Sequence, residues 1–373
     1  MLSLTLIAIP TLIAILTLPL PLPTLALNIT ILQPSTPFFP SPLPPPSAAS
    51  HSDAIVAAFS KLGRTTTWKL ISAIPFQGDT YEPEGITRIG EDRYLVSAGE
   101  YTELTQKFGT NPGGSSVILN GTDRTAGAGF AHLIVFDGNG SRIADATLTE
   151  RGAIEYHNGG IDYDGKYIWA TIAQYRPNTT ATLVRIDPST LEPTTISHIS
   201  DHQGGVVHDT STDKLYTLNW GSRNSTSFLP NQHATYISFT SPIRVQRNPS
   251  YFIDYQDCKF LGHPAYYQHR STMLCSGIAT LGSADQTFNL GGLAIVDTET
   301  MTPLDEVPVV LQSELGVNVA QNPMDVGVVD GKLRVYWLPD QRNSTLYVYE
   351  AQPGSPFEYG GDGGGAQSFE HAR

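Results

Sequence analysis

From residue 84 onward, short apolar segments alternate with turn residues, and the pattern recurs at intervals of roughly 40–50 residues. Each unit opens on a segment such as Glu84–Ile89, Asn158–Tyr163 or Gln203–His208 and continues with a second apolar segment such as Tyr167–Ala170. A third segment ends in an acidic turn, as Leu183–Asp187 does, and a more polar fourth segment closes the unit. Four short antiparallel strands joined by turns are typical of a propeller blade.

The repeat predicts an all-β chain built as a five-bladed β-propeller, with blades that begin near residues 82, 156, 201, 250 and 321. The fifth unit lacks a fourth strand after Glu350, and the isolated apolar segment Thr67–Ile74 can supply it. Closure of the last blade by this N-terminal strand would remove two sheet edges at once. A six-bladed propeller and a β-sandwich are the alternatives.

The first 52 residues contain no Asp, Glu, Lys or Arg, and residues 2–18 are largely apolar. We expect residues 1–26 to be a secretory signal peptide, with an uncleaved membrane anchor as the alternative. Seven prolines between positions 34 and 46 favour extended, solvated backbone, so we interpret residues 27–65 as a Pro-rich linker or propeptide with one short helix. The propeller would span residues 66–350, and the Gly-rich residues 351–373 would form a disordered tail.

The chain carries 35 acidic and 22 basic residues, a formal net charge of −13. This charge disfavours nucleic acid and anionic membrane surfaces as partners. An export route would join the only two cysteines, Cys258 and Cys275, in a disulfide bond, and two buried thiols are the alternative. Six Asn-X-Ser/Thr sequons behind a signal peptide predict a secreted glycoprotein, extracellular or attached to a cell wall, modified at Asn28, Asn120, Asn139, Asn178, Asn224 and Asn343.

Polar residues gather where the first strand of each predicted blade begins, which is one mouth of the central channel. Oxygen-bearing side chains at this mouth could hold one divalent cation, Ca²⁺ or Zn²⁺, with His157 and His202 left to move protons. A bound cation would polarise a carbonyl or acidify a water molecule. The alternative is that these groups only hydrogen-bond neighbouring strands and channel waters. The candidate metal ligands are Glu84, Asn158, Gln203 and Asn322.

Four further residues at the predicted ends of second strands are candidate ligand-binding groups: Arg176, Asn219, Trp220 and Arg223. The two arginines could clamp an anionic substrate, or they could only pair with acidic residues across blades. Trp220 could pack in the core or form a platform for a ligand. Four of the six sequons follow second strands, so their glycans would surround the same mouth. The chain contains no G-x-S-x-G, H-E-x-x-H, P-loop or dinucleotide-binding glycine motif, so we expect no nucleotide cofactor.

Several segments resemble exported fungal and bacterial propeller-like proteins grouped as a domain of unknown function. The likeness covers about residues 66 to 350. It implies a propeller but no assigned reaction and no established catalytic residues. A more distant, fold-level likeness to gluconolactonase-type propellers implies a divalent cation at the channel mouth. The segments that carry the main resemblance are 158–165, 201–210, 219–223, 251–258, 273–277 and 344–350.

Three hypotheses about function follow. In the first, the protein is a monomeric, cation-assisted, lactonase-like hydrolase of a small molecule or of the end of a polymer chain. In the second, it is a non-catalytic module that binds a glycan ligand of a cell wall. In the third, it is a structural wall protein tethered by its Pro-rich segment. None of the three includes a nucleic-acid partner, or a membrane partner once the signal peptide is cleaved.

Overall fold

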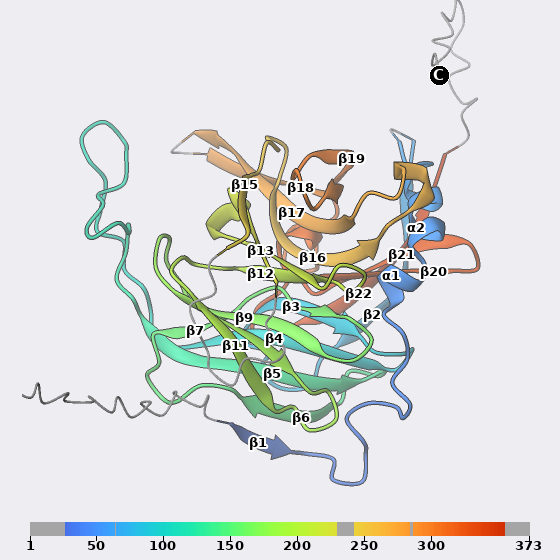
Figure 1. The fold of residues 1–373 in the computed structure, drawn as a ribbon, viewed down its shortest axis with the longest axis horizontal. Helices are drawn as coiled ribbons and strands as arrows, with labels where there is room; N and C mark the ends of the chain where they lie inside the picture. Colours follow the sequence, from blue (N-terminus) through green and yellow to red (C-terminus); the bar gives the residue numbers. More distant parts are fainter. Residues whose placement is uncertain (1–26, 64, 230–241, 284–285, 355–373) are drawn as a thin grey trace, which may run out of the picture.

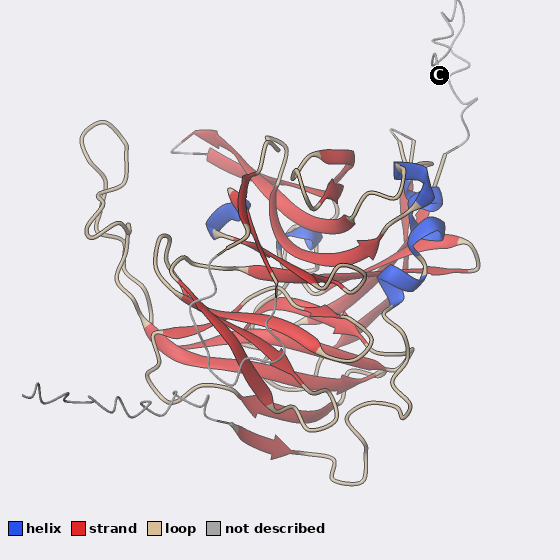
Figure 2. Cartoon of the chain, in the orientation of Figure 1, coloured by secondary structure: helices blue, strands red, loops and turns tan. Residues whose placement is uncertain are grey.

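Five antiparallel sheets surround one axis in the computed structural model, which describes residues 27–63, 65–229, 242–283 and 286–354. Strands make up nearly all of the regular structure, and the longest helical segments lie at one edge of the molecule (Figure 2). The innermost strands of the five sheets contact one another, as expected for blades around a channel. The predicted five-bladed β-propeller is therefore confirmed, and the six-bladed and β-sandwich alternatives are wrong.

The first two blades form from the outer strand to the axis as follows (Figure 1). Blade one contains β1 (Asn28–Ile31), β6 (Arg142–Thr147), β5 (Ala128–Asp137), β4 (Arg93–Glu103) and β3 (Glu82–Arg88). Blade two contains β11 (Pro193–Ile199), β10 (Ala181–Ile186), β9 (Ile168–Gln174) and β7 (Glu155–Asn158), and the short β8 (Asp162–Tyr163) also pairs with β9.

The other three blades have four strands each. Blade three contains β15 (Arg244–Arg247), β14 (Asn224–Phe228), β13 (Lys214–Leu218) and β12 (Gly205–Asp209). Blade four contains β19 (Pro303–Val309), β18 (Gln286–Asp297), β17 (Thr272–Ser283) and β16 (Asp254–Gly262). Blade five contains β2 (Thr67–Pro75), β22 (Thr345–Gln352), β21 (Lys332–Trp337) and β20 (Met324–Val329).

The N-terminal strand β2 completes the last blade, as the sequence predicts. It pairs antiparallel with β22, from Thr67 opposite Gln352 to Pro75 opposite Thr345. The two ends of the propeller domain are thus held in one sheet. The predicted disulfide is also present: Cys258 and Cys275 face each other on β16 and β17 with their Cα atoms 4.1 Å apart.

Apolar side chains are buried chiefly between blades. Among the described residues there are five clusters of buried apolar side chains, and each joins two neighbouring blades. The inner and middle strands supply most of these residues because both of their faces are covered. All of β9 is buried, for example, whereas the outer strand β11 is mostly half-exposed. This gradient explains why the fourth segment of each repeat is the most polar.

The Pro-rich N-terminal segment packs on the propeller and is not a solvated linker. Its first strand, β1, pairs with β6 and adds a fifth strand to blade one. The helices α1 (Ser47–Ser50) and α2 (Ser52–Phe59) follow, and Ile55 and Phe59 are buried in the cluster between blades four and five. The expected linker therefore differs from the structure because its scattered apolar residues find partners on the blades.

This segment crosses the end of the channel opposite the mouth predicted to carry the site. The hydroxyl of Tyr163 donates to the carbonyl of Pro44 at 2.7 Å, and the carboxylate of Asp53 accepts from the backbone N–H of Ala265 at 2.9 Å. A side chain on Gly165, in the turn between the first two strands of blade two, would lie 3.0 Å from Pro46. The segment thus covers turns that the sequence suggested were solvent-exposed.

The two predicted terminal segments are only partly tested. The signal peptide, residues 1–26, lies outside the described residues, as does most of the expected tail. Strand β22 ends at Gln352, two residues beyond the predicted end of the propeller. No helix within the described ranges is long and apolar enough to cross a membrane.

One buried ion pair lies where the inner strands meet. The carboxylate of Asp257 and the ammonium of Lys259, both on β16, are 2.7 Å apart and almost completely buried. Asp257 also accepts backbone N–H groups of Ile86 in blade one and Met324 in blade five, each at 3.2 Å. Lys259 donates to the carbonyl of Ile161 in blade two at 2.7 Å. Four blades therefore meet through one pair of charges.

A second buried carboxylate connects blade two to blade three. Asp162 accepts the backbone N–H of His208 at 3.1 Å and is 4 % exposed. Its burial raises its pKa to about 7, although the nearby Lys259 ammonium opposes the shift. Together with the Asp257–Lys259 pair, this contact links all five inner strands.

We predict that Lys259→Met destabilises the protein by about 3–5 kcal/mol, because it leaves the carboxylate of Asp257 buried without its partner. The control Lys332→Met removes a half-exposed lysine that pairs with Glu350, and we expect it to change stability by about 1 kcal/mol or less. Urea unfolding measures both. The double variant Asp257→Asn/Lys259→Met should be more stable than Lys259→Met alone, and the opposite order would contradict the assignment.

We predict that Asp162→Asn changes how stability depends on pH. Because the folded-state pKa of Asp162 is raised to about 7, only the folded state holds this proton between about pH 4 and pH 7. The wild-type protein should therefore lose up to about 1.4 kcal/mol per pH unit as the pH rises through this window. Urea unfolding of both proteins from pH 4 to 8 should show Asp162→Asn gaining stability relative to wild type. A constant difference would refute the shift.

Candidate functional site

Three inner strands carry a β-bulge at the predicted mouth of the channel. In β3 the pairing register shifts between Pro83 and Gly85, which makes Glu84 the extra residue. The same kind of shift makes Tyr156 the extra residue in β7 and Gln256 the extra residue in β16. A bulge re-aims side chains out of the regular alternation of a strand and is common beside active sites. The repeat therefore turns equivalent residues of blades one, two and four toward the same mouth.

Glycines bring three of the inner strands unusually close at the same level. A side chain on Gly159 would lie 2.3 Å from the carbonyl oxygen of Gly204, and one on Gly85 would lie 2.9 Å from the carbonyl oxygen of Gly159. No Cβ atom tolerates such distances, so these positions require glycine. The residues immediately before these glycines are Glu84, Asn158 and Gln203.

A cavity of about 260 Å³ opens at this mouth. Residues of blades one to four line it, so it combines side chains that are far apart in the sequence. Five of the residues singled out from the sequence lie in its wall: Glu84, His157, His202, Asn219 and Trp220.

The cavity wall contains an acidic and imidazole cluster. The Nε2 atom of His157 lies 3.5 Å from the Glu84 carboxylate, and the His157 ring stacks on Tyr175 with centroids 5.0 Å apart. Burial alone would lower the pKa of His157, but the Glu84 carboxylate outweighs it and raises that pKa above its usual value. Glu82, two residues before Glu84, has a pKa raised to about 8 by burial and by the Glu84 charge. At neutral pH Glu82 thus retains a proton while His157 is charged.

His202 has a different protonation state and a defined tautomer. Its Nδ1 atom donates to the carbonyl oxygen of Gln174 at 2.7 Å, which leaves Nε2 with a lone pair. Burial, together with the nearby charge of His157, lowers the pKa of His202 to about 3. His202 is therefore neutral across the physiological range and can accept a hydrogen bond from a ligand.

Several buried polar atoms around the cavity have no hydrogen-bond partner in the protein. They include Nδ1 of His157, Oδ1 of Asn158 and both amide atoms of Gln203. The Asn158 amide nitrogen, in contrast, donates to the carbonyl of His132 at 2.8 Å, which fixes its side chain. An unpaired buried polar atom costs about 1–3 kcal/mol, so such a group of atoms indicates a place where a ligand, ion or water completes the bonding.

Three predicted site residues are occupied elsewhere. The amide of Asn322 donates to the carbonyl of Pro339 in its own blade at 3.1 Å. The guanidinium of Arg176 donates to the side-chain oxygen of Gln174 at 2.6 and 2.8 Å. Arg223 forms an ion pair with Asp254 of the next blade, which is the interblade pairing that the sequence analysis kept as its alternative.

Residues around this cavity that the sequence analysis did not select include Tyr175, Tyr255, Gln256 and Arg124. The Arg124 guanidinium lies over the Trp220 ring at 4.6 Å and is held by Asp123 in a two-point ion pair. Gln256 could have been found, because it precedes the axis residue of blade four as Gln203 precedes Gly204. The Gly-Gly pair that marks the other blades is replaced there by Asp257 and Cys258.

Four sequons lie beside this mouth. The amide of Asn178 donates to the carbonyl of Gly121, the neighbour of Asn120, at 2.8 Å. The backbone N–H of Asn224 donates to Asn219 in the cavity wall at 2.7 Å. Asn343 follows Gln341 by two residues, and Gln341 donates to Glu82 at 2.9 Å. Glycosylation of these residues, and of Asn28 and Asn139 elsewhere, stays a prediction.

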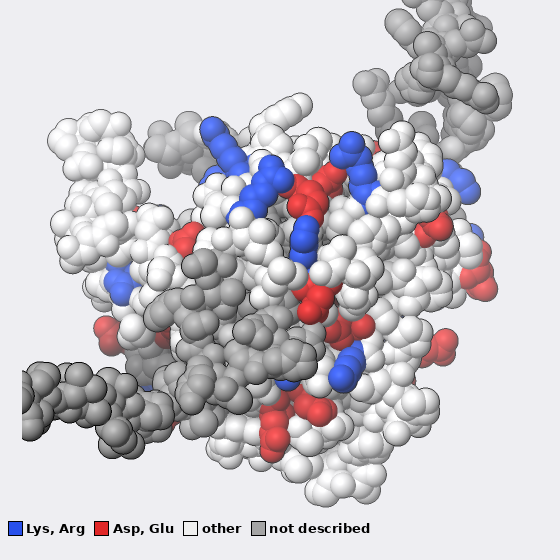
Figure 3. All heavy atoms as spheres, viewed as in Figure 1, with Lys and Arg blue, Asp and Glu red and all other residues white. Residues whose placement is uncertain are grey.

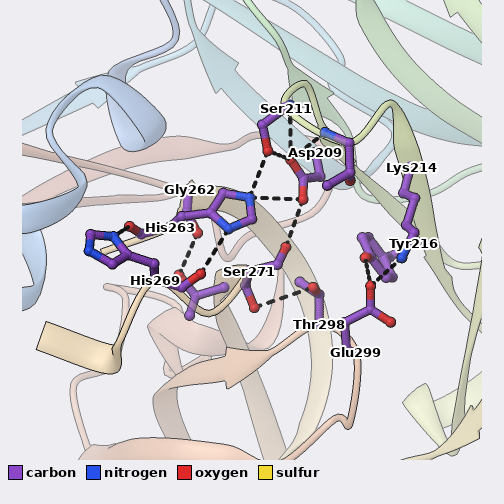
Figure 4. A network of polar contacts seen from close by, with 12 residues as sticks. Asp209, Ser211, Lys214, Tyr216, Gly262, His263, His269, Ser271, Thr298 and Glu299 are labelled. Atoms are coloured by element: carbon purple, nitrogen blue, oxygen red, sulfur yellow. Dashed lines mark hydrogen bonds and ion pairs between the residues drawn. The ribbon is translucent and has the colours of Figure 1, made fainter. Parts of the chain in front are cut away.

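A second titratable cluster joins blades three and four at the opposite end (Figure 4). Asp209 accepts hydrogen bonds from the hydroxyls of Ser211 at 2.7 Å and Ser271 at 3.0 Å. The Nε2 atom of His263 lies 2.8 Å from the Ser211 hydroxyl and 3.0 Å from Asp209. A catalytic serine needs the carboxylate on the other imidazole nitrogen, whereas here that nitrogen contacts the carbonyl of His269. The cluster therefore connects loops and does not form a nucleophile.

Comparison with protein families gives one match, to the family described as "Family of unknown function (DUF6454)", over residues 43–353. The chain belongs to this family. The match covers the docked N-terminal helices and all five blades, in agreement with the resemblance found in the sequence. No curated protein matches.

Solved structures with propeller-like folds are similar to the family member only at a distance. An α-L-arabinofuranosidase from Fusarium graminearum in complex with an iminosugar inhibitor has 8% identity, covers 75% of this chain and 98% of its own, and gives a TM-score of 0.41. A chain of a nidogen/laminin complex has 10% identity, with 60% and 79% covered and a TM-score of 0.34. The WD40 domain of a Toxoplasma gondii coronin has 9% identity, with 77% and 87% covered and a TM-score of 0.30. Scores this low carry no argument about function.

Proposed function

We propose that the cavity at the channel mouth hydrolyses a small ester or lactone, or such a group at the end of a polymer, with the help of a divalent cation. The observation that carries the proposal is the set of buried, unpaired oxygen atoms of Asn158 and Gln203 beside the Glu84 carboxylate. The three residues precede the glycines at which blades one, two and three approach most closely. Carboxylate and amide oxygens are the ligands that Ca²⁺ prefers.

The donor set favours calcium over zinc. Within the described ranges, no group of three or more His, Cys, Asp or Glu side chains could hold a metal ion. Zinc sites are built from such groups, and calcium sites accept amide and carbonyl oxygens as well. Of the four ligands suggested by the sequence, Glu84, Asn158 and Gln203 fit this interpretation. Asn322 fits less well because its amide nitrogen is bound to Pro339.

A divalent cation, when bound, would polarise the carbonyl of the substrate and lower the pKa of a water molecule. The surrounding residues would then position and protonate the reactants. His157 has a free Nδ1 atom and can take a proton from the attacking water, while Glu84 orients its ring through Nε2. Nε2 of His202 can accept a hydrogen bond from a substrate hydroxyl. Trp220 and Tyr175 supply apolar walls.

A second candidate function is the binding of a neutral carbohydrate without catalysis. It is favoured by the aromatic side chains Trp220, Tyr175 and Tyr255 in the wall of the same cavity, next to the amide of Asn219. Aromatic rings beside amide and carboxylate groups suit the apolar faces and hydroxyls of a sugar ring. This candidate needs neither the cation nor proton transfer by His157.

We predict that Ca²⁺ raises the melting temperature of the chelator-treated protein. At 100 times its Kd a bound cation would add about 2.7 kcal/mol to stability. Glu84→Gln should abolish the rise, because it removes the only charged ligand. The control Asp92→Asn, an exposed carboxylate paired with Arg93, should retain it. Differential scanning calorimetry with and without Ca²⁺ measures both, and a Ca²⁺ response that survives Glu84→Gln would eliminate this site.

The same variants test hydrolysis. We expect turnover of small lactones and aryl esters to require Ca²⁺ and to fall by about 10²–10⁴ in His157→Gln, the range for loss of a general base. Stopped assays on a lactone panel provide the measurement. No Ca²⁺-dependent turnover of any member would reject the hydrolase.

We predict for the second candidate that Trp220→Ala abolishes binding to an array of neutral glycans while His157→Gln does not. Tyr266→Ala, an exposed aromatic side chain far along the chain from the cavity, is the control and should bind as the wild type does. Array binding by fluorescence supplies the readout. If no glycan binds the wild-type protein, carbohydrate recognition at this cavity is ruled out.

A further inference from the structure

A second and larger cavity, about 1080 Å³, runs along the side of the propeller between blades three and four. We call it the basic groove. Its wall includes three arginines, and its other polar side chains are neutral amides and hydroxyls. On the face drawn in Figure 3, basic side chains gather over the region of β15 and the neighbouring β17. The residues used below are Arg223, Arg244, Arg247, Gln246, Asn248 and Tyr251.

Two of the three arginines have no acidic partner within the parts of the chain that the structure describes. Arg244 donates to the side chain of Gln246 at 2.6 Å, and Arg247 forms no ion pair there. The nearest acidic group to affect Arg244 is Glu299, whose oxygen is bound by Lys214 at 2.5 Å. The neighbouring residues 230–241 contain no Asp or Glu. The groove is therefore locally positive on a protein whose net charge is −13.

The basic groove is adjacent to the cavity at the channel mouth. Asp254 lines the mouth cavity, Arg223 lines the groove, and the two form an ion pair. Their side chains are 49% and 50% exposed, so water screens the pair and little free energy opposes its opening. One ligand could therefore occupy both cavities by passing this pair.

We propose that the basic groove binds an acidic oligosaccharide, a sugar chain whose carboxylates are held by Arg244 and Arg247, and that the groove leads the end of this chain to the mouth cavity. The proposal rests on the proposed function for the reaction but not for the binding. It specifies the substrate class: a polymer that carries carboxylates.

The chemistry of the groove favours an acidic sugar over other polyanions. Guanidinium groups bind carboxylates through two parallel hydrogen bonds. The amides of Gln246 and Asn248 suit sugar hydroxyls, and Tyr251 is 97% exposed at the rim, where a sugar face can stack. A nucleic acid carries much denser charge and would be repelled by the rest of this acidic surface.

The test is calorimetric titration with a short oligogalacturonate, in 50 mM and 500 mM salt, about 14 and 4 Å of Debye length. All proteins carry Asn224→Gln, because Asn224 also lines the groove and its predicted glycan would lie there. We expect Arg244→Gln/Arg247→Gln to weaken binding about tenfold or more. The control Lys61→Gln/Lys332→Gln changes the net charge equally, outside the groove, and should leave affinity unchanged. A neutral cello-oligosaccharide of the same length should bind weakly to every variant.

The outcomes separate the two proposals. Binding that is lost in the arginine variant but kept in Glu84→Gln supports the groove, even if the cavity shows no hydrolysis. Equal binding by the arginine and control variants overturns it. Equal binding of a single-stranded oligonucleotide, lost in the same variant, also overturns it, because the groove would then be a site for any polyanion.

Discussion

The Asp257–Lys259 ion pair is the contact on which the arrangement of the blades depends. A propeller closes only if its inner strands meet at the axis, where their backbone groups compete for a small number of partners. Asp257 takes two of these groups, one from each neighbouring position in blades one and five, and Lys259 takes a carbonyl from blade two. Because both charges are almost fully buried, each depends on the other for its free energy. The pair thus couples local strand geometry to closure of the whole ring.

Closure at the axis also determines where chemistry can occur. The inner strands come together through Gly85, Gly159 and Gly204, and the bulges of β3, β7 and β16 lie at the same level. Side chains that precede these points cannot all pair with backbone groups, since the strands already use those groups with one another. The opposite end of the channel has no comparable vacancy of partners, because the N-terminal segment packs across its turns. The two mouths therefore differ physically, and only one combines a cavity with unpaired polar atoms.

The sequence predicted the parts of the structure that depend on local pattern. Strand alternation and turn residues gave five blades, and the unpaired segment at Thr67–Ile74 gave the closing strand. Residues adjacent to the repeated glycines gave Glu84 and His157. The repeat failed at Gln256, because Asp257 and Cys258 stand where other blades have glycine, and it gave no sign that Lys259 would be buried. The Pro-rich segment was misjudged because its docking depends on tertiary contacts such as Tyr163 with Pro44, which no local periodicity encodes.

The electrostatics of the site and of the groove converge on one ion pair. Asp254 faces the mouth cavity, and burial raises its pKa although Arg223 opposes the shift. Arg223 faces the groove, where Arg244 and Arg247 have few acidic neighbours. A carboxylate that enters the groove would compete with Asp254 for Arg223, and each such exchange would replace one ion pair by another at small cost in a half-exposed position. The barrier between the two cavities is therefore weakest toward a ligand that carries the same charge as Asp254.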